Sequence, residues 1–120
     1  MDPAPTATEI RVRRGTRALE VAFDDGSRVS LPAEYLRVES PSAEVQGHAP
    51  SEKRLVAGKR AVNIEAVDPV GNYAIRIRFT DGHDTGIYSW PLLHQLAREH
   101  DRRWQEYLAA LERTGQSREP

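Results

Sequence analysis

The feature that most constrains the fold is a segment that occurs twice. Residues 18–26 (Ala-Leu-Glu-Val-Ala-Phe-Asp-Asp-Gly) align without a gap with residues 74–82 (Ala-Ile-Arg-Ile-Arg-Phe-Thr-Asp-Gly). In both, apolar residues occupy every second position, which is typical of a strand with one buried face. Both end in Asp-Gly, the strongest short signal for a β-hairpin turn. Beyond the turn, Leu31 falls opposite Ile87, so we predict that the chain consists of two similar halves.

Each half is predicted to follow the order strand, strand, Asp-Gly turn, short strand, helix. In the first half, we expect three strands and a short helix at residues 8–13, 18–23, 28–31 and 33–36. In the second half, we expect strands at residues 62–67, 73–79 and a short segment ending at 87 or 88. Two such halves predict an α+β domain of antiparallel β-hairpins covered on one face by helices. The alternative is chance, because a strand followed by Asp-Gly is a common pattern.

The second half carries two further expectations. Pro69 and Gly71 indicate a turn over residues 68–72, between the first two strands of this half. The strand after this turn should bury every second side chain, namely Tyr73, Ile75, Ile77 and Phe79.

A C-terminal amphipathic helix is predicted to begin near Ser89 or Trp90, with Ser89 as its N-cap. A break is expected near His100, and Thr114-Gly115 should end the helix. Its apolar stripe repeats at spacings of three and four residues: Leu93, Ala97, His100, Trp104, Leu108 and Leu111.

The chain length suits one domain with flexible ends. We divide it into a disordered N-terminus, the domain, a helical extension and a disordered tail: residues 1–7, 8–98, 99–114 and 115–120. Ser40 is predicted to cap a helical turn that contains Pro41 and Glu44. Residues 46–60 hold glycine, proline and several charges, so we expect a long mobile loop there.

Composition excludes several classes of function. The 120 residues include no cysteine, which rules out disulfides and thiolate metal sites. The net charge is -1, and basic and acidic residues are interleaved, so we expect no nucleic-acid partner. No apolar run approaches the about 20 residues of a membrane span, and the N-terminus lacks the features of a signal peptide. A cytoplasmic protein is expected.

Three segments together resemble one family. They are residues 36–48 (Leu-Arg-Val-Glu-Ser-Pro-Ser-Ala-Glu-Val-Gln-Gly-His), 70–73 (Val-Gly-Asn-Tyr) and 81–90 (Asp-Gly-His-Asp-Thr-Gly-Ile-Tyr-Ser-Trp). The sequence is similar to the gamma-butyrobetaine hydroxylase-like N-terminal domain family over roughly residues 8–98. The resemblance implies a small bacterial stand-alone domain of unknown function. Related domains precede the catalytic domain of carnitine-biosynthesis oxygenases, and others are fused to P-loop iron–sulfur cluster carriers.

The resemblance also implies a zinc site, which this sequence has largely lost. In the oxygenases, three cysteines and a histidine bind structural zinc. The cysteine positions match Ser40, Ser42 and Val45 here, and the histidine matches His83. Serine and valine cannot replace zinc thiolates, so we expect no zinc site of that form.

A different metal site is one hypothesis for His83. It could bind iron or zinc weakly together with His48 and with Asp84 or Glu44. The alternative is structural, with the imidazole of His83 hydrogen bonded to backbone groups in the turn. No facial triad of an iron oxygenase, P-loop or nucleophile elbow is present, so we expect no enzyme activity and no bound cofactor.

Tyr88, Trp90 and His83 form the predicted partner-binding surface, because aromatic residues supply much contact area. Core packing of the two aromatic residues is the alternative. The leading hypothesis is a non-catalytic accessory module that binds a protein, such as an iron–sulfur carrier or a metallo-enzyme. The second is an iron- or zinc-binding domain, and the third is a small-molecule-binding domain with its pocket under residues 81–90. A monomer and an edge-paired homodimer both stay open.

Overall fold

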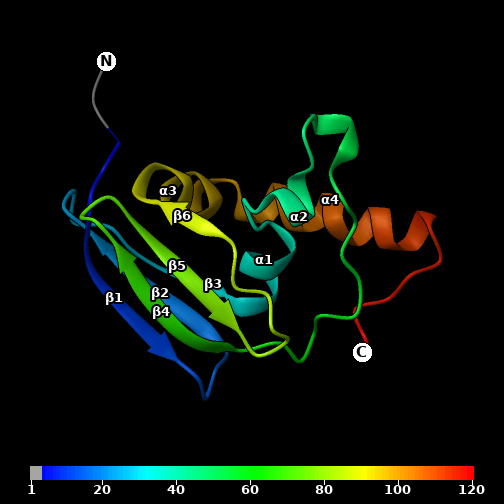
Figure 1. Ribbon diagram of the computed structural model, residues 1–120, viewed down its shortest axis with the longest axis horizontal. Coiled ribbons are helices and arrows are strands. Elements are labelled where there is room, and N and C mark those ends of the chain that lie inside the picture. The colour runs from blue at the N-terminus through cyan, green and yellow to red at the C-terminus, as the bar shows by residue number, and fades with distance from the viewer. Residues whose placement is uncertain (1–3) are drawn as a thin grey trace.

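The strands form two three-stranded antiparallel sheets, one in each half of the chain. The computed structural model describes residues 4–120. In the first sheet, the strands lie in the order β1 (Ala7–Arg13), β2 (Ala18–Phe23) and β3 (Arg28–Pro32). In the second sheet, they lie in the order β4 (Ile64–Val70), β5 (Ala74–Phe79) and β6 (Ile87–Ser89). Figure 1 shows β1 beside β4, so the two sheets meet through their first strands.

Helices follow each sheet. After β3 come α1 (Ala33–Val38), α2 (Ala43–Gln46) and a single 3-10 turn, η1 (Pro50–Glu52). After β6 come α3 (Trp90–Arg98) and α4 (His100–Arg113), and α4 extends away from the strands (Figure 1). This architecture confirms the predicted α+β class, the antiparallel hairpins and the C-terminal helix. The break near His100 is confirmed too, because the helical backbone is interrupted at Glu99.

The two halves repeat each other down to the geometry of the Asp-Gly turn. The last residue of β2 donates its backbone N–H to the carbonyl of Ser27 at 2.9 Å, and the last residue of β5 donates to His83 at 3.0 Å. Both turns need a left-handed backbone, which glycine adopts at no steric cost: φ is +88° at Gly26 and +90° at Gly82. The first strand of each sheet also has an irregular register near its start, between Ala7 and Glu9 in β1 and between Ile64 and Ala66 in β4.

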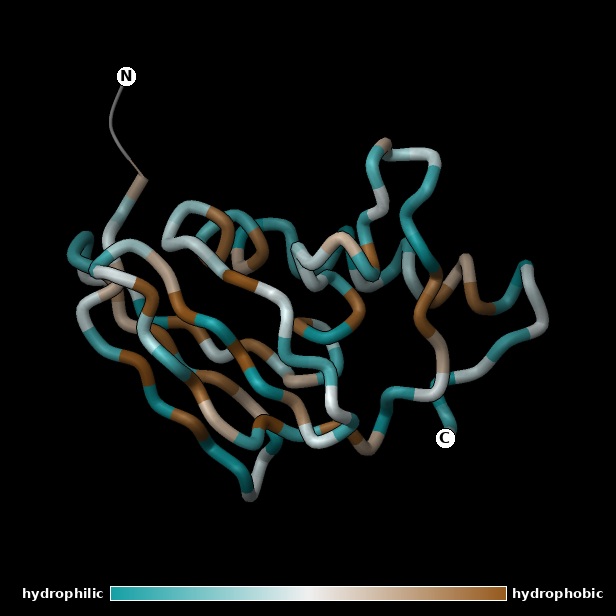
Figure 2. The backbone as a smooth tube through the Cα atoms, viewed as in Figure 1, coloured by the Kyte–Doolittle hydropathy of each residue, from teal (hydrophilic) through white to brown (hydrophobic). Residues whose placement is uncertain are grey.

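The core lies between the strands and helices α1 and α3. Figure 2 shows the hydrophobic residues recurring along the strands, as the alternating sequence predicts. The largest fully buried side chains come from both halves of the chain: Tyr35, Tyr88, Phe79, Leu19, Leu31, Leu36, Ile64, Ile77, Leu93 and Leu96. The halves therefore share one core.

The junction between β1 and β4 is only partly closed. At one end, Arg14 donates through Nη2 to the carbonyl of Glu65 at 2.6 Å, and Asn63 donates through Nδ2 to the carbonyl of Arg14 at 2.9 Å. Along the rest, a groove of about 560 Å³ separates the strands. Its lining includes the apolar residues Ile10, Val12, Val67, Pro69, Ile75 and Trp90.

Two expectations for the second half are wrong. Pro69 lies inside β4 rather than in a turn. Proline has no backbone N–H, and an edge strand tolerates this because a donor missing from its outer side breaks no hydrogen bond of the sheet. Tyr73 lies in the turn before β5 and is 58% exposed, so the buried face of this strand begins at Ile75.

The connection between the halves contains α2 and also contacts α4. Ser42 caps α2, since its side chain accepts a hydrogen bond from the backbone N–H of Glu44 at 3.2 Å; the predicted cap, Ser40, has another role. Within the loop 46–60, Val56 accepts a hydrogen bond from the hydroxyl of Tyr107 in α4 at 2.7 Å. Apolar contacts with α4 from residues 55–57 hold this segment in place.

Residues near both ends of the described chain hydrogen bond to the domain. The N-terminal prediction lies partly outside the described residues, but Thr6 donates its backbone N–H to Asp24 at 3.1 Å. At the other end, Ser117 and Arg118 accept backbone hydrogen bonds from Gly58 and Arg60 at 2.9 and 3.0 Å. No helix within residues 4–120 has the length and apolar character needed to cross a bilayer.

Candidate functional site

His83 lies at the centre of a buried polar cluster that joins the two halves. Its Nε2 atom is 2.8 Å from the hydroxyl oxygen of Ser40, and its Nδ1 atom is 3.0 Å from a carboxylate oxygen of Glu44. The imidazole is 3% exposed and Ser40 is fully buried, whereas Glu44 is 62% exposed. The polar groups therefore form a line from solvent at Glu44 to the interior at Ser40.

Local structure fixes both partners of this contact. The backbone N–H of His83 donates to Asp81 at 3.1 Å, an Asx turn that is made possible by the left-handed backbone of Gly82. Ser40 follows α1, and its hydroxyl oxygen accepts the backbone N–H of Ser42 at 3.2 Å. These hydrogen bonds hold both turns so that the side chains of His83 and Ser40 meet.

Gly86 and Tyr88 close the cluster from the side of β6. A Cβ atom on Gly86 would lie 2.6 Å from the hydroxyl oxygen of Ser40 and 3.1 Å from the ring of Tyr88. Tyr88 is fully buried, and its hydroxyl donates to the carbonyl of Leu36 at 2.6 Å. Tyr88 thus occupies space beneath residues 81–90, where the third hypothesis placed a ligand pocket.

Burial favours the neutral form of the His83 imidazole. Desolvation, followed by the charge of Arg37, lowers the pKa of His83 below its ordinary value of 6.5, although Glu44 acts in the opposite direction. In the neutral ring, Nδ1–H donates to the carboxylate of Glu44, which can only accept. Nε2 then accepts the hydroxyl proton of Ser40, so each polar atom of the ring has a partner.

This connectivity is that of a serine, histidine and carboxylate triad. A nucleophilic serine must reach a substrate, but Ser40 is 0% exposed, and the close approach of Gly86 covers it. The arrangement therefore supports a buried structural network rather than nucleophilic catalysis.

A second cluster of charges lies beside His83. Asp81 Oδ2 accepts hydrogen bonds from Lys59 Nζ at 2.6 Å and from Arg37 Nε at 2.8 Å. Burial opposes ionisation of Asp81, but the hydrogen bonds from Lys59, the backbone of His83 and Arg37 outweigh it and lower the pKa of Asp81 to about 2. Nη1 of Arg37 is buried without a hydrogen-bond partner among the described residues.

The proposed metal ligands do not converge. Across residues 4–120, no three His, Cys, Asp or Glu side chains are grouped as a metal site requires. His83 approaches Glu44, but His48 is exposed and its backbone N–H donates to Glu52 at 2.6 Å, and Asp84 is exposed. The zinc site implied by the family does not fit either, because Ser40 already occupies Nε2 of His83 and Val45 offers no donor.

The structure buries two of the three residues of the predicted partner-binding surface. Tyr88 and His83 are buried and cannot form a contact surface, since the phenol of Tyr88 satisfies its polar end inside the core. Trp90 is half-buried in the groove between β1 and β4, where its indole N–H donates to the carbonyl of Asn72 at 2.9 Å. The exposed large apolar side chains are Tyr73 and Ile87.

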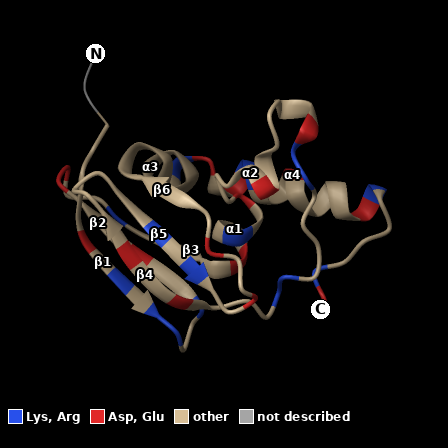
Figure 3. Cartoon of the chain, in the orientation of Figure 1, with Lys and Arg blue, Asp and Glu red and all other residues tan. Residues whose placement is uncertain are grey.

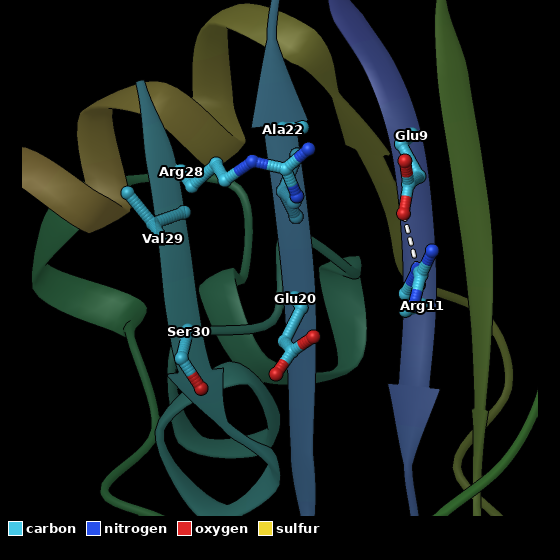
Figure 4. Close-up of a pocket in the computed structure, with 8 residues that line it drawn as sticks. Glu9, Arg11, Glu20, Ala22, Arg28, Val29 and Ser30 are labelled. Carbon is cyan, nitrogen blue, oxygen red and sulfur yellow. Dashed lines mark hydrogen bonds and ion pairs between the residues drawn. The ribbon is translucent and has the colours of Figure 1, made fainter. Parts of the chain in front are cut away.

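The outer face of the first sheet is charged but mixed in sign. A shallow pocket of about 260 Å³ lies there, and Figure 4 shows Glu9, Arg11, Glu20 and Arg28 around it. Glu9 pairs with Arg11 within β1, and Figure 3 shows acidic and basic segments interleaved over the visible face. The charges around this pocket therefore alternate in sign.

Sequence reasoning missed the partners of the important residues more than the residues themselves. His83 and Glu44 were identified, but Ser40 was interpreted as a helix cap. Arg37 and Lys59 were not predicted as partners of Asp81, because nothing local in the sequence indicates that they converge on it. The matching turns of the two halves carry Ser27 in the first half and His83 in the second. This difference was the one clue that the imidazole is not needed to form the turn itself.

Comparison with known proteins identifies one matching family and several similar structures. Residues 10–94 match the model of the family described as "Gamma-butyrobetaine hydroxylase-like, N-terminal". Two solution NMR structures are similar, one with 48% identity and a TM-score of 0.85, covering 100% of this chain and 92% of that one. The other has 40% identity and a TM-score of 0.84, covering 98% and 93%.

A crystal structure from Acidithiobacillus ferrooxidans ATCC 23270 is similar as well. It has 39% identity and a TM-score of 0.65, covering 77% of this chain and 92% of that one, and it is described as a protein of unknown function in the DUF971 family. A comparison with curated proteins found no match.

Proposed function

Because the chain belongs to the gamma-butyrobetaine hydroxylase-like N-terminal domain family, we propose that it is a non-catalytic accessory module that binds another protein. The family resemblance predicted from the sequence is confirmed. A single observation supports the proposal most strongly: the chemistry-bearing cluster around His83 is buried and satisfies its own hydrogen bonds. Such a cluster stabilises the fold and leaves binding to the surface.

The groove between β1 and β4 is the proposed binding surface. Each of these strands is an edge strand of its sheet, so each presents unpaired backbone N–H and C=O groups toward the groove. The apolar lining, including Val12, Val67 and Trp90, offers pockets for alternate side chains. This combination fits an extended segment of a partner, which binds by adding a strand.

The proposed partner class is an iron–sulfur cluster carrier or an iron-dependent enzyme. It is supported by the family resemblance, which implies fusions of related domains to P-loop iron–sulfur carriers and to oxygenases. Nothing in the site favours metal binding by the chain itself, since His83, His48 and Asp84 do not converge.

Isothermal titration of the purified chain with an iron–sulfur carrier from the same genome tests the proposal. We expect binding that weakens at least tenfold in Trp90→Ala, which removes an aromatic side chain from the groove. Arg28→Ala is the matched control, because Arg28 is exposed on β3, and its binding should stay within twofold of wild type. Binding that Trp90→Ala leaves unchanged would exclude the groove, and no binding to carriers or iron enzymes would overturn the proposed role.

A further inference from the structure

The C-terminal segment places an arginine in a pocket between α1 and α4. Arg118 donates from Nε to one carboxylate oxygen of Glu34 at 2.8 Å and from Nη2 to the other at 2.6 Å. These two parallel bonds match the planar fork of a guanidinium to a carboxylate, the geometry that distinguishes arginine from lysine. The pair joins residues 84 positions apart in the sequence.

The carboxylate of Glu34 is built into the fold. Its side chain is only 8% exposed, whereas that of Arg118 is 34% exposed. A buried carboxylate needs a cation with hydrogen-bond donors, because the loss of hydration is otherwise uncompensated. Glu34 thus provides the buried part of the site, and Arg118 the more exposed part.

Trp104 provides a second recognition element. The guanidinium carbon of Arg118 lies 5.2 Å from the centroid of the Trp104 ring, within the range of a cation–π contact. The indole is held edge-on to Tyr35 at 6.3 Å, and Tyr35 stacks on His100 at 4.3 Å. The aromatic wall is therefore fixed by packing and does not depend on Arg118 alone.

The pocket has the charge of a cation-binding site. Its volume is about 400 Å³. The carboxylate of Glu34 pairs with the guanidinium of Arg118, and Asp101 also belongs to the lining. Without Arg118, the carboxylate of Glu34 and the ring of Trp104 would be left in the pocket without a cation.

The segment that delivers Arg118 is held by polar contacts, which include an ion pair between Arg60 and Glu119. It is paired with residues 58–60 through two backbone hydrogen bonds, Gly58 to Ser117 at 2.9 Å and Arg60 to Arg118 at 3.0 Å. Residues 112–117 and 119–120 are exposed. Figure 1 shows this end of the chain crossing the segment near residue 60, away from the main core. Exposed segments that are held by polar contacts, with few buried apolar side chains, open at low free energy.

We propose that the pocket around Glu34 and Trp104 is an arginine-recognition site that the chain's own Arg118 occupies. An arginine in an extended segment of another protein would bind there by displacing residues 117–120. Arg118 competes with the partner's arginine at a high effective concentration, because it belongs to the same chain as the pocket. A partner segment must therefore bind the pocket tightly enough to displace residues 117–120. This site is separate from the groove between β1 and β4.

The test uses the full chain with Arg118→Ala and the peptide acetyl-Ser-Arg-Glu-Pro, which has the sequence of residues 117–120. The indole N–H signal of Trp104 is followed by NMR during titration. We expect a saturable shift in Arg118→Ala and at least tenfold weaker binding in wild type. The double variant Arg118→Ala, Glu34→Gln should lose the response, and a peptide with lysine in place of arginine should bind at least tenfold more weakly.

A folded Arg118→Ala variant whose Trp104 signal ignores the peptide would overturn the proposal, leaving Arg118 as a structural clamp. An undiminished response in the Glu34→Gln background would overturn it as well. Should Arg118→Ala fail to fold, Arg118→Lys replaces it, because lysine keeps a positive charge beside Glu34 but lacks the two-pronged fork. The arginine peptide must then shift the Trp104 signal of the lysine variant more strongly than that of wild type.

Discussion

The imidazole of His83 and the hydroxyl of Ser40 are joined by a hydrogen bond of 2.8 Å across 43 positions of sequence. Ser40 follows the helix of the first half, and His83 lies in the Asp-Gly turn of the second. Both groups are buried, so water cannot replace the bond if one partner is lost. The contact therefore helps to fix how the two halves are joined.

Replacing Ser40 with alanine should destabilise the protein by about 1–3 kcal/mol, because Nε2 of His83 would stay buried without a donor. Urea denaturation at pH 7.5 measures this loss. Ser30→Ala is the matched control, since Ser30 is exposed on β3, and its effect should stay within about 0.5 kcal/mol. Equal stability of the Ser40 and Ser30 variants would show that the buried hydrogen bond does not contribute to the free energy of unfolding.

Gly86→Ala should also be destabilising, by about 1–3 kcal/mol, because a Cβ atom there would lie 2.6 Å from the hydroxyl oxygen of Ser40. Gly15→Ala is the control, since a Cβ at Gly15 meets no atom within 4 Å. Thermal unfolding should give a clearly lower Tm for the Gly86 variant alone. A similar Tm for both variants would mean that residues 40 and 86 are not in close contact.

Stability should fall as the pH drops below about 6.5. In the folded protein, desolvation and Arg37 lower the pKa of His83 below its ordinary 6.5, so between these two pKa values the unfolded chain binds a proton that the folded protein does not. Stability is therefore complete above pH 6.5 and decreases as the pH falls toward the pKa of the folded state. The measurement is the urea midpoint between pH 7.5 and 5.5.

His83→Gln should lose this part of the pH dependence, whatever its stability at pH 7.5. The other histidines are still present in the variant and serve as an internal control. If wild type and His83→Gln show parallel pH profiles, the histidine is not held in its neutral form.

Asp81→Asn should cost about 1 kcal/mol at pH 7, because Lys59 and Arg37 lose their shared carboxylate; exposure to solvent limits the loss. The pKa of Asp81 is lowered from 3.8 to about 2, so its contribution is present above pH 3.8 and is lost as the pH falls through about 2. Denaturation at pH 7 and pH 2 measures the difference, with exposed Asp84→Asn as control. A penalty that persists undiminished at pH 2 would contradict the ionic origin.

Local patterns in the sequence were sufficient to predict the strands and the Asp-Gly turns. Alternation and turn chemistry act within a few residues, so residues 18–26 and 74–82 show their structure directly. The failures arise where distant residues decide the outcome. Pro69 was placed in a turn, although an edge strand accommodates it.

The candidate site shows the same division. His83 and Glu44 stand out by residue type, but Ser40 and Ser42 are equally good helix caps on local grounds. Only the distant imidazole of His83 distinguishes them, since it hydrogen bonds to Ser40 and leaves Ser42 to cap α2. Likewise, Tyr88 was expected at the surface because alternation alone does not reveal which face of a short strand is buried.

The C-terminal segment could not have been predicted from its own composition. Polar residues near a chain end normally fray, and the features that hold Arg118 are Glu34 in α1 and Trp104 in α4. Neither leaves a signal near residue 118. Contacts of this kind follow from the completed fold.

We infer that the cluster around His83 supports the fold and holds no metal in the purified protein. Native mass spectrometry with elemental analysis of protein purified without a histidine tag tests it most directly, alongside His83→Ala. We predict the mass of the chain alone in both proteins, with iron and zinc far below one per chain. Near-stoichiometric iron or zinc in wild type that is missing from folded His83→Ala would contradict the claim.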